Sequence, residues 1–512
     1  MQPIRLVRGF VTVGFWTLVS RIAGFVRDVM MAAYLGTGPV AEAFLVAFSL
    51  PNMFRRFFGE GAFNTAFVPL FSKKLEGGED AKGFAEDAMA GLSFLVICVS
   101  VVAIAFMPWL VLLQAAGFAG DERLGLATTF GRITFPYIWL ISLTALFSGL
   151  LNAGGRFVAA AAAPVLLNVI FIAAMLWADR AGWDMGLTMA WATPVTGAAQ
   201  LALVWWAAAR MGFPLRLRRP RMTPDLRRLL LIAVPAVMAG GVVQINLLVG
   251  RQVGSFFDGA IAWLSYADRL YQLPLGVVGI AIGIVLLPDL SRRLKAGDEG
   301  GSRHALSRAM EFALFLTMPA AAALVVIAVP LISVLFERGE FLPSDTAPTA
   351  LALAVYGLGL PAFVMQKVLQ PLYFAREDTR TPFRFALWSM LVNALLAVGL
   401  AFWLGFIAAA IGTTLSGWIM TAQLWWGARG MGPAARMDDR FRHRLPRIAM
   451  ATAVMAAVLA GLSWLLAPAL GAAGHRYWAL LALVAGGMAS YGGAALALGA
   501  LTRADLKGGL GR

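Results

Sequence analysis

Cysteine, histidine and charged residues are scarce in this 512-residue chain, and each scarcity excludes a class of protein. The one cysteine, Cys98, lies inside an apolar run, so no disulfide within the chain is expected. The three histidines, His304, His443 and His475, lie in predicted loops without metal-ligand spacing, so no metal site is predicted. Only 13% of the residues are charged while 60% are hydrophobic, which excludes an ordinary soluble enzyme and a disordered protein.

Apolar runs recur from one end of the sequence to the other, and a transmembrane helix needs about 20 such residues. Alternating segments of about ten residues, typical of a membrane β-barrel, are missing. The opening MQPIRLVRGF leads into a run without a small-residue cleavage site, so the first helix is expected to be retained. We therefore predict an all-α polytopic membrane protein with fourteen transmembrane helices. The predicted spans are 9–35, 41–72, 86–113, 127–152, 157–178, 186–210, 229–250, 259–290, 307–336, 346–374, 383–404, 407–428, 447–470 and 476–500.

The net charge of +15 is distributed very unevenly between the connections. Thirty Lys and Arg residues fall in the termini and in alternate loops, the Arg-rich loop 210–228 among them, whereas the opposite loops hold five, Arg123 among them. Basic residues accumulate on the cytoplasmic side of membrane proteins, where they also meet anionic headgroups. The pattern predicts that both termini are cytoplasmic, and it explains the positive charge without a nucleic-acid partner.

An internal repeat divides the chain. The segment FVPLFSKKL at 67–75 is echoed by LLPDLSRRL at 286–294, and Pro136 and Asn168 are echoed by Pro361 and Asn393. A shift of six spans preserves orientation, so the repeats would be related by a pseudo-twofold axis along the membrane normal, with a site between them. This predicts two six-helix lobes and two additional C-terminal helices. The predicted boundaries are 1–212 for the first lobe, 213–430 for the second, and 431–512 for the C-terminal pair and tail.

Charged residues inside the first two spans and the eighth are the candidate site. Arg21 and Asp28 lie two helical turns apart on one face, and Arg27 lies about 100° further round. Arg55 and Arg269 are further arginines within spans. Such groups are costly in a bilayer and usually face a wet interior. Guanidinium groups in excess of carboxylates favour an anionic, phosphorylated or carboxylated ligand, although snorkelling and internal ion pairs are the structural alternative.

Four further charged residues are weaker candidates. Arg56 and Glu60 are spaced to pair with each other on a helix, Asp268 partly balances Arg269, and Lys367 lines the cavity or snorkels. The chain has no GxxxxGK[ST] motif, so no ATP hydrolysis is expected within it. No cofactor is predicted, and the energy would come from an ion gradient, the membrane potential or downstream consumption of the substrate.

Four stretches carry a resemblance to a known family: SRIAGFVRD, LPNMFRRFFGEGAFNTAFVP, TFPYIWLISL and YADRLYQLPLGVVGIAIGIVLLP. With them the chain resembles, over nearly its whole length, the MurJ (MviN) family of bacterial lipid II flippases in the MOP exporter superfamily. The resemblance implies a transporter, not an enzyme. Its substrate would be the undecaprenyl-pyrophosphate-linked peptidoglycan precursor, moved from the cytoplasmic to the periplasmic leaflet of the inner membrane by alternating access.

The resemblance also implies the substrate-binding residues. Those that match the family's functional positions are Arg21, Arg27, Asp28, Glu42, Arg55 and Arg269. The chain departs from the pattern at Ser49 and Gln272, where some relatives carry lysine and glutamate. The resemblance implies that the working unit is a single chain, a monomer. It does not indicate which proteins of cell-wall synthesis are its partners.

The sequence leaves two alternative functions open. One is a sibling transporter for another polyprenyl-linked glycan, or a related exporter of the MOP superfamily. The other is a membrane enzyme acting on the same lipid, which would need a carboxylate–metal or His/Asp constellation that is not visible. For the transport cycle, Gly24, Gly36, Gly38 and Gly276 are candidate hinge points.

Overall fold

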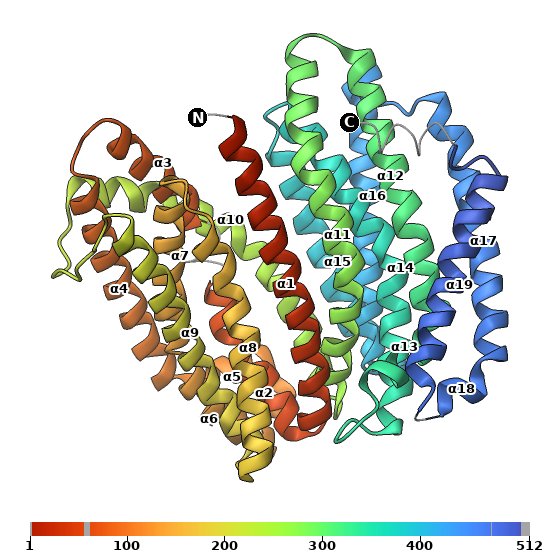
Figure 1. The fold of residues 1–512 in the computed structure, drawn as a ribbon, viewed down its shortest axis with the longest axis horizontal. Helices are drawn as coiled ribbons and strands as arrows, with labels where there is room; N and C mark the ends of the chain where they lie inside the picture. Colours follow the sequence, from red (N-terminus) through yellow and green to blue (C-terminus); the bar gives the residue numbers. More distant parts are fainter. Residues whose placement is uncertain (1–2, 56–61, 473, 503–512) are drawn as a thin grey trace. The chain divides into compact units, whose positions relative to one another are not determined.

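A computed structural model describes residues 3–55, 62–472 and 474–502. The described residues form helices and no β-strand (Figure 1). The α-helices are α1 Pro3–Leu35, α2 Pro39–Arg55, α3 Ala62–Glu76, α4 Ala81–Ala105, α5 Met107–Gln114, α6 Glu122–Thr134, α7 Tyr137–Ala153, α8 Val158–Ala181, α9 Met185–Arg210, α10 Pro224–Gly254, α11 Ala260–Lys295, α12 Glu299–Val326, α13 Ala328–Phe336, α14 Pro343–Phe374, α15 Arg380–Leu404, α16 Ile407–Ala428, α17 Asp439–Leu465, α18 Ala467–Gly471 and α19 Arg476–Ala497. Short 3₁₀ helices occur at η2 Ala116–Phe118, η3 Arg429–Met431 and η4 Pro433–Ala435.

Ten helical segments among the described residues are long and apolar enough to cross a membrane. They comprise α4, α6 with α7, α8, α9, α12, α14, α15, α16, α17 and α19. The prediction of an all-helical, multi-pass membrane protein is confirmed at this level.

Several predicted spans are interrupted helices rather than continuous ones. The span predicted at 86–113 divides into α4 and α5, and Pro108 lies in the first turn of α5. The span predicted at 127–152 divides into α6 and α7 at Pro136. Proline lacks the backbone N–H that would continue the hydrogen-bond ladder, so a helix restarts at these points. Hydropathy alone did not reveal these interruptions, because the residues on both sides of each break are apolar.

The described residues pack as two compact units, and the first comprises 1–262 with 339–341. Within it, α1 packs on α8, α2 on α6, and α9 on both α7 and α8. Its core is rich in phenylalanine, and the ring of Phe67 stacks with those of Phe71 and Phe84, each at a centroid distance of 5.5 Å. Helix α10 packs on α3, α4 and α5 and therefore belongs to this unit. Packing and internal repetition are different criteria, so the boundaries of the repeat-based lobes stay a prediction.

The second unit comprises 263–338 and 342–512. Within it, α14 packs on α12 and α16, and α15 packs on α16. The C-terminal helices α17 and α19 pack on each other, and α17 also packs along α12. A separate apolar core, which includes Ile448, Leu459 and Leu483, joins α17 and α19 to α12 and α13. The C-terminal helix pair is thus attached to the second unit through α12 and α13.

Candidate functional site

Of the candidate site residues on α1, Arg27 and Asp28 form a buried ion pair. Arg27 donates hydrogen bonds from Nε at 3.1 Å and from Nη2 at 2.6 Å to Oδ1 of Asp28. Both residues are buried, with 8% and 7% of their surface exposed, and the guanidinium lies 5.9 Å from the ring centroid of Phe171 on α8. Both hydrogen bonds use the Nε–Nη2 edge of the guanidinium, so the two N–H donors of Nη1 take no part in this pair.

Close packing of α1 on α8 positions this pair. Asn168 of α8 donates a hydrogen bond from Nδ2 to the carbonyl oxygen of Ser20 at 2.9 Å. The amide of Asn168 also lies against Gly24, where a Cβ atom would be 3.5 Å from it. The side chain of Asn168 therefore packs against α1 at Gly24. The sequence repeat had singled out Asn168, and the structure assigns it this role in helix packing.

Two further predicted site residues belong to the same unit as Arg27. Arg21 is half-buried on α1, and Arg55 is the half-buried last residue of α2. Arg56 and Glu60 lie outside the described residues.

Pro51 interrupts the hydrogen-bond ladder of α2 one turn before Arg55. Its missing N–H leaves the carbonyl of Ala47 without a helical donor. The hydroxyl of Thr134 on α6 lies 3.4 Å from that oxygen and 3.3 Å from the carbonyl oxygen of Gly131, so the two carbonyls share it as a donor. The neighbouring helix thus satisfies the carbonyl that proline frees, which is how a helix inside a bilayer tolerates proline.

Glu42 belongs to a polar cluster at the start of α2. Its side chain is 1% exposed and accepts hydrogen bonds from Arg123 Nη1 at 2.8 Å and from the backbone N–H of Ile261 at 2.9 Å. Arg123 also pairs with Asp121 at 2.5 Å and Asp258 at 3.1 Å. Both carboxylate oxygens of Glu42 are therefore engaged by groups of its own unit. The structure shows a tethering role that the sequence could not indicate, because Arg123 had been assigned only to a loop.

The candidates in the second unit lie on α11 and α14. Asp268 accepts a hydrogen bond from Gln272, one turn further along α11. Arg269 is exposed and Asp268 is half-buried. Lys367 is an exposed residue of α14 between the buried Gln366 and Val368.

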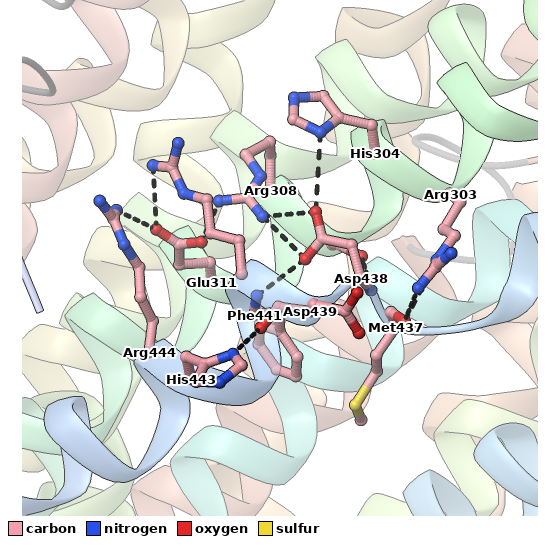
Figure 2. Close-up of polar contacts among 12 residues, drawn as sticks. Arg303, His304, Arg308, Glu311, Met437, Asp438, Asp439, Phe441, His443 and Arg444 are labelled. Carbon is pink, nitrogen blue, oxygen red and sulfur yellow. Dashed lines mark hydrogen bonds and ion pairs between the residues drawn. The ribbon is translucent and has the colours of Figure 1, made fainter.

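Sequence reasoning missed a second group of buried charges, where α12 meets the start of α17 (Figure 2). Glu311 pairs with Arg308, with Arg444 at 2.5 Å and with Arg440 at 3.4 Å. Arg308 also binds both carboxylate oxygens of Asp438, at 2.6 and 2.9 Å. Each of the three arginines pairs with at least one of the two carboxylates, Glu311 and Asp438, which is typical of a structural connection between helices. The sequence did offer one signal for this cluster, the glutamate Glu311 inside the apolar span predicted at 307–336.

Among the residues that the structure describes, no group of three or more His, Cys, Asp or Glu side chains is arranged to hold a metal ion.

The family model described as "Lipid II flippase MurJ" matches residues 31–476 of this chain. A protein of Rhizobium meliloti named "Probable lipid II flippase MurJ" is 45% identical over 504 residues, covering 96% of this chain and 94% of that protein. "Lipid II flippase MurJ" of Burkholderia cenocepacia is 37% identical over 403 residues, covering 77% of this chain and 78% of that protein.

Solved structures agree with the sequence relatives. The structure titled "Lipid II flippase MurJ, inward closed conformation" superposes with a TM-score of 0.78 at 26% identity, covering 94% of this chain and 97% of that one. An inward-facing multidrug resistance MATE transporter of the MOP superfamily superposes with a TM-score of 0.68 at 13% identity, covering 83% of this chain and 98% of that one. The second likeness concerns the fold alone.

Proposed function

This chain belongs to the lipid II flippase MurJ family, and from that membership we propose that it moves lipid II across the bacterial inner membrane. It is a multi-pass membrane transporter, not an enzyme. Lipid II carries its disaccharide-pentapeptide on undecaprenyl pyrophosphate, so the headgroup to be moved is large and anionic. The movement runs from the cytoplasmic to the periplasmic leaflet by alternating access.

The buried Arg27–Asp28 pair is the observation that carries the proposal at the level of residues. A guanidinium inside a membrane helix is costly unless it has a partner, and Asp28 supplies one while the site is empty. Asp28 occupies one edge of the guanidinium, and the Nη1 edge suits a phosphate oxygen. Arg27 thus binds the pyrophosphate without losing its carboxylate partner, and Asp28 keeps the charge compensated after release.

We extend the proposal to the other charged candidates, taken unit by unit. Arg21 and Arg55 bind the anionic headgroup together with Arg27 in the first unit, and Arg269 does so in the second. Asp268 partly balances the charge of its neighbour Arg269, and Lys367 on α14 is a further cation of the second unit. Glu42 contributes indirectly, by holding the start of α2 in place, since both its carboxylate oxygens are already bound within the unit.

We further propose fourteen transmembrane helices with both termini in the cytoplasm. In support, each of the fourteen predicted ranges overlaps one or two of the described helices. The two lobes, 1–212 and 213–430, and the C-terminal segment 431–512 follow from the repeat. The chain works as a monomer beside the cell-wall synthesis machinery, and an ion gradient or the membrane potential drives it.

Complementation tests the function and the site together. The chain is expressed in cells depleted of their own lipid II flippase, as wild type and as Arg27→Ala and Arg269→Ala, with membrane levels measured. We expect growth and wall synthesis with the wild type and loss of both with either variant. Arg132→Ala is the matched control, because Arg132 is also an arginine of a predicted span but is exposed and donates to the carbonyl of Ile104.

The possible results separate substrate from site. A well-inserted wild type that fails to rescue would contradict lipid II as the substrate and favour another polyprenyl-linked glycan. Rescue by Arg27→Ala at the wild-type rate would refute the role of Arg27 and leave the substrate assignment standing.

A further inference from the structure

The connection between α9 and α10 is the most basic short segment of the chain. Residues 210–228 contain seven arginines and one acidic residue, Asp225. Asp225 pairs with Lys74 of α3 at 3.0 Å, so it is already engaged outside the loop. The segment therefore presents a strong positive charge at the surface of the first unit.

The loop is held against the unit by buried contacts. Leu215 is buried in the core, and the ring of Phe213 meets that of Phe71 edge-on at 5.7 Å. The buried carboxylate of Glu86 on α4 accepts a hydrogen bond from the backbone N–H of Arg216 at 3.1 Å and pairs with Arg218 Nη2 at 2.5 Å. These contacts fix the backbone at 213–218 and thereby the direction in which the following side chains leave the surface.

Glu86 neutralises Arg218, but the other loop arginines have no such partner. Arg216, Arg219 and Arg221 are exposed and form no ion pair with any residue that the structure describes. Two large apolar side chains alternate with them: Leu217 and Met222 are 60% and 69% exposed. Exposed arginines interleaved with exposed apolar side chains suit a surface that is anionic outside and apolar just beneath.

The flanking helices indicate that the loop lies at the membrane–water boundary. At the end of α9, Trp205 and Trp206 are exposed, and the guanidinium of Arg210 lies 4.0 Å from the ring centroid of Trp206. At the start of α10, the exposed Arg227 and Arg228 precede the exposed Leu231 by one turn. Tryptophan and arginine mark the headgroup level of membrane helices. Both ends of the loop are therefore at that level.

We propose that the exposed segment 216–222 is a docking surface for anionic phospholipid headgroups of the cytoplasmic leaflet. The guanidinium groups of Arg216, Arg219 and Arg221 bind the phosphodiester oxygens, while Leu217 and Met222 enter the boundary with the acyl chains. Glu86 is the positioning residue, because it holds the loop backbone at Arg216. The surface is distinct from the arginines of the transport site, which lie on α1, α2 and α11.

Lipid titration of the full-length protein tests this proposal. Purified protein in neutral detergent is titrated with phosphatidylglycerol or, for comparison, phosphatidylcholine, and the shift in Tm gives an apparent affinity. The test variant is Arg216→Gln/Arg219→Gln/Arg221→Gln. The matched control, Arg429→Gln/Arg436→Gln/Arg442→Gln, removes the same charge from other exposed arginines on the side predicted to be cytoplasmic. Each arginine near an anionic surface contributes severalfold to affinity, so we expect at least about a tenfold loss for the loop variant.

The control variant should lose less than about twofold in apparent affinity for phosphatidylglycerol. The wild-type response should weaken as the salt concentration is raised. Leu217→Ser/Met222→Ser should also weaken the response to phosphatidylglycerol, because its net charge is unchanged and only the apolar contact is lost. Equal losses in the loop and control variants would overturn the proposal. A loop-dependent response to a polyprenyl pyrophosphate or to polyglutamate but not to phosphatidylglycerol would overturn it too, by assigning the surface to the substrate or to an acidic protein.

Discussion

Glu42 of α2 and Arg123 of α6, 81 residues apart in the chain, form an ion pair of 2.8 Å in which neither side chain is more than 6% exposed. The pair is surrounded by the backbone N–H of Ile261 and the carboxylates of Asp121 and Asp258. It joins the start of α2 to α6, to Asp258 in the connection between α10 and α11, and to the first turn of α11. A residue that family resemblance assigns to substrate binding is thus also a structural tether.

Replacing either partner of this pair should destabilise the protein strongly. Glu42→Gln leaves the guanidinium of Arg123 buried with less compensation, and breaking a buried pair in this way costs about 3 kcal/mol or more. Thermal unfolding in detergent measures the loss. Glu42→Gln/Arg123→Gln should lose less than the sum of the single variants, because the two groups are coupled. Additive losses would show that the pair is not coupled, and an unchanged Tm for Glu42→Gln would contradict the tether.

The turn between α1 and α2 should not tolerate a side chain at Gly36. This residue has φ of +65°, and a Cβ atom there would lie 2.4 Å from the carbonyl oxygen of Glu340. Gly36→Ala should cost about 2 kcal/mol or more in stability, since it adds left-handed strain to a backbone collision. Gly38→Ala is the control, because no atom lies within 4 Å of its Cβ position. Unfolding temperatures of the two variants test this, and equal values would contradict it.

The cluster between α12 and α17 should hold the C-terminal helix pair in place. Glu311→Gln removes the carboxylate that Arg308, Arg440 and Arg444 share, leaving three cations close together. We expect faster hydrogen exchange in the first turns of α17 and a loss of roughly 3 kcal/mol in stability. Asp439→Asn removes the same charge from an exposed residue of that turn and should have little effect. Unchanged exchange in Glu311→Gln would show that apolar packing alone holds α17.

Asp378, in the connection before α15, should give a small acid-dependent loss of stability. Its carboxylate accepts a hydrogen bond from the backbone N–H of Thr381 at 3.0 Å, and chiefly for this reason its pKa lies below the ordinary value. A depressed folded-state pKa adds stability above the unfolded pKa of about 4, and that stability is lost as the pH falls through the folded value. Asp378→Asn should flatten this part of the Tm–pH curve, measured below about pH 5. An identical curve for the variant would contradict the assignment.

The helices, the apolar surface and the local charge pairs were accessible from the sequence because they depend on near neighbours. Runs of apolar residues predict membrane helices from composition alone. Arg27 and Asp28 are adjacent in the chain, so their pairing needed no knowledge of the fold. The interrupted hydrogen-bond ladder at Pro51 is likewise a local property, because the missing N–H belongs to the residue itself.

Tertiary structure decided which distant groups meet. The sequence placed Arg123 in a loop, and only the packing of α2 on α6 brings it to Glu42. Glu311 and Arg444 lie 133 residues apart, and no periodicity connects them. The hydroxyl that satisfies Ala47 likewise comes from another helix. Inside a membrane protein a buried charge or carbonyl must find a partner, but apolar neighbours do not specify which one. Sequence alone therefore determined the helices and where charges would be costly, and the packing of the helices determined their partners.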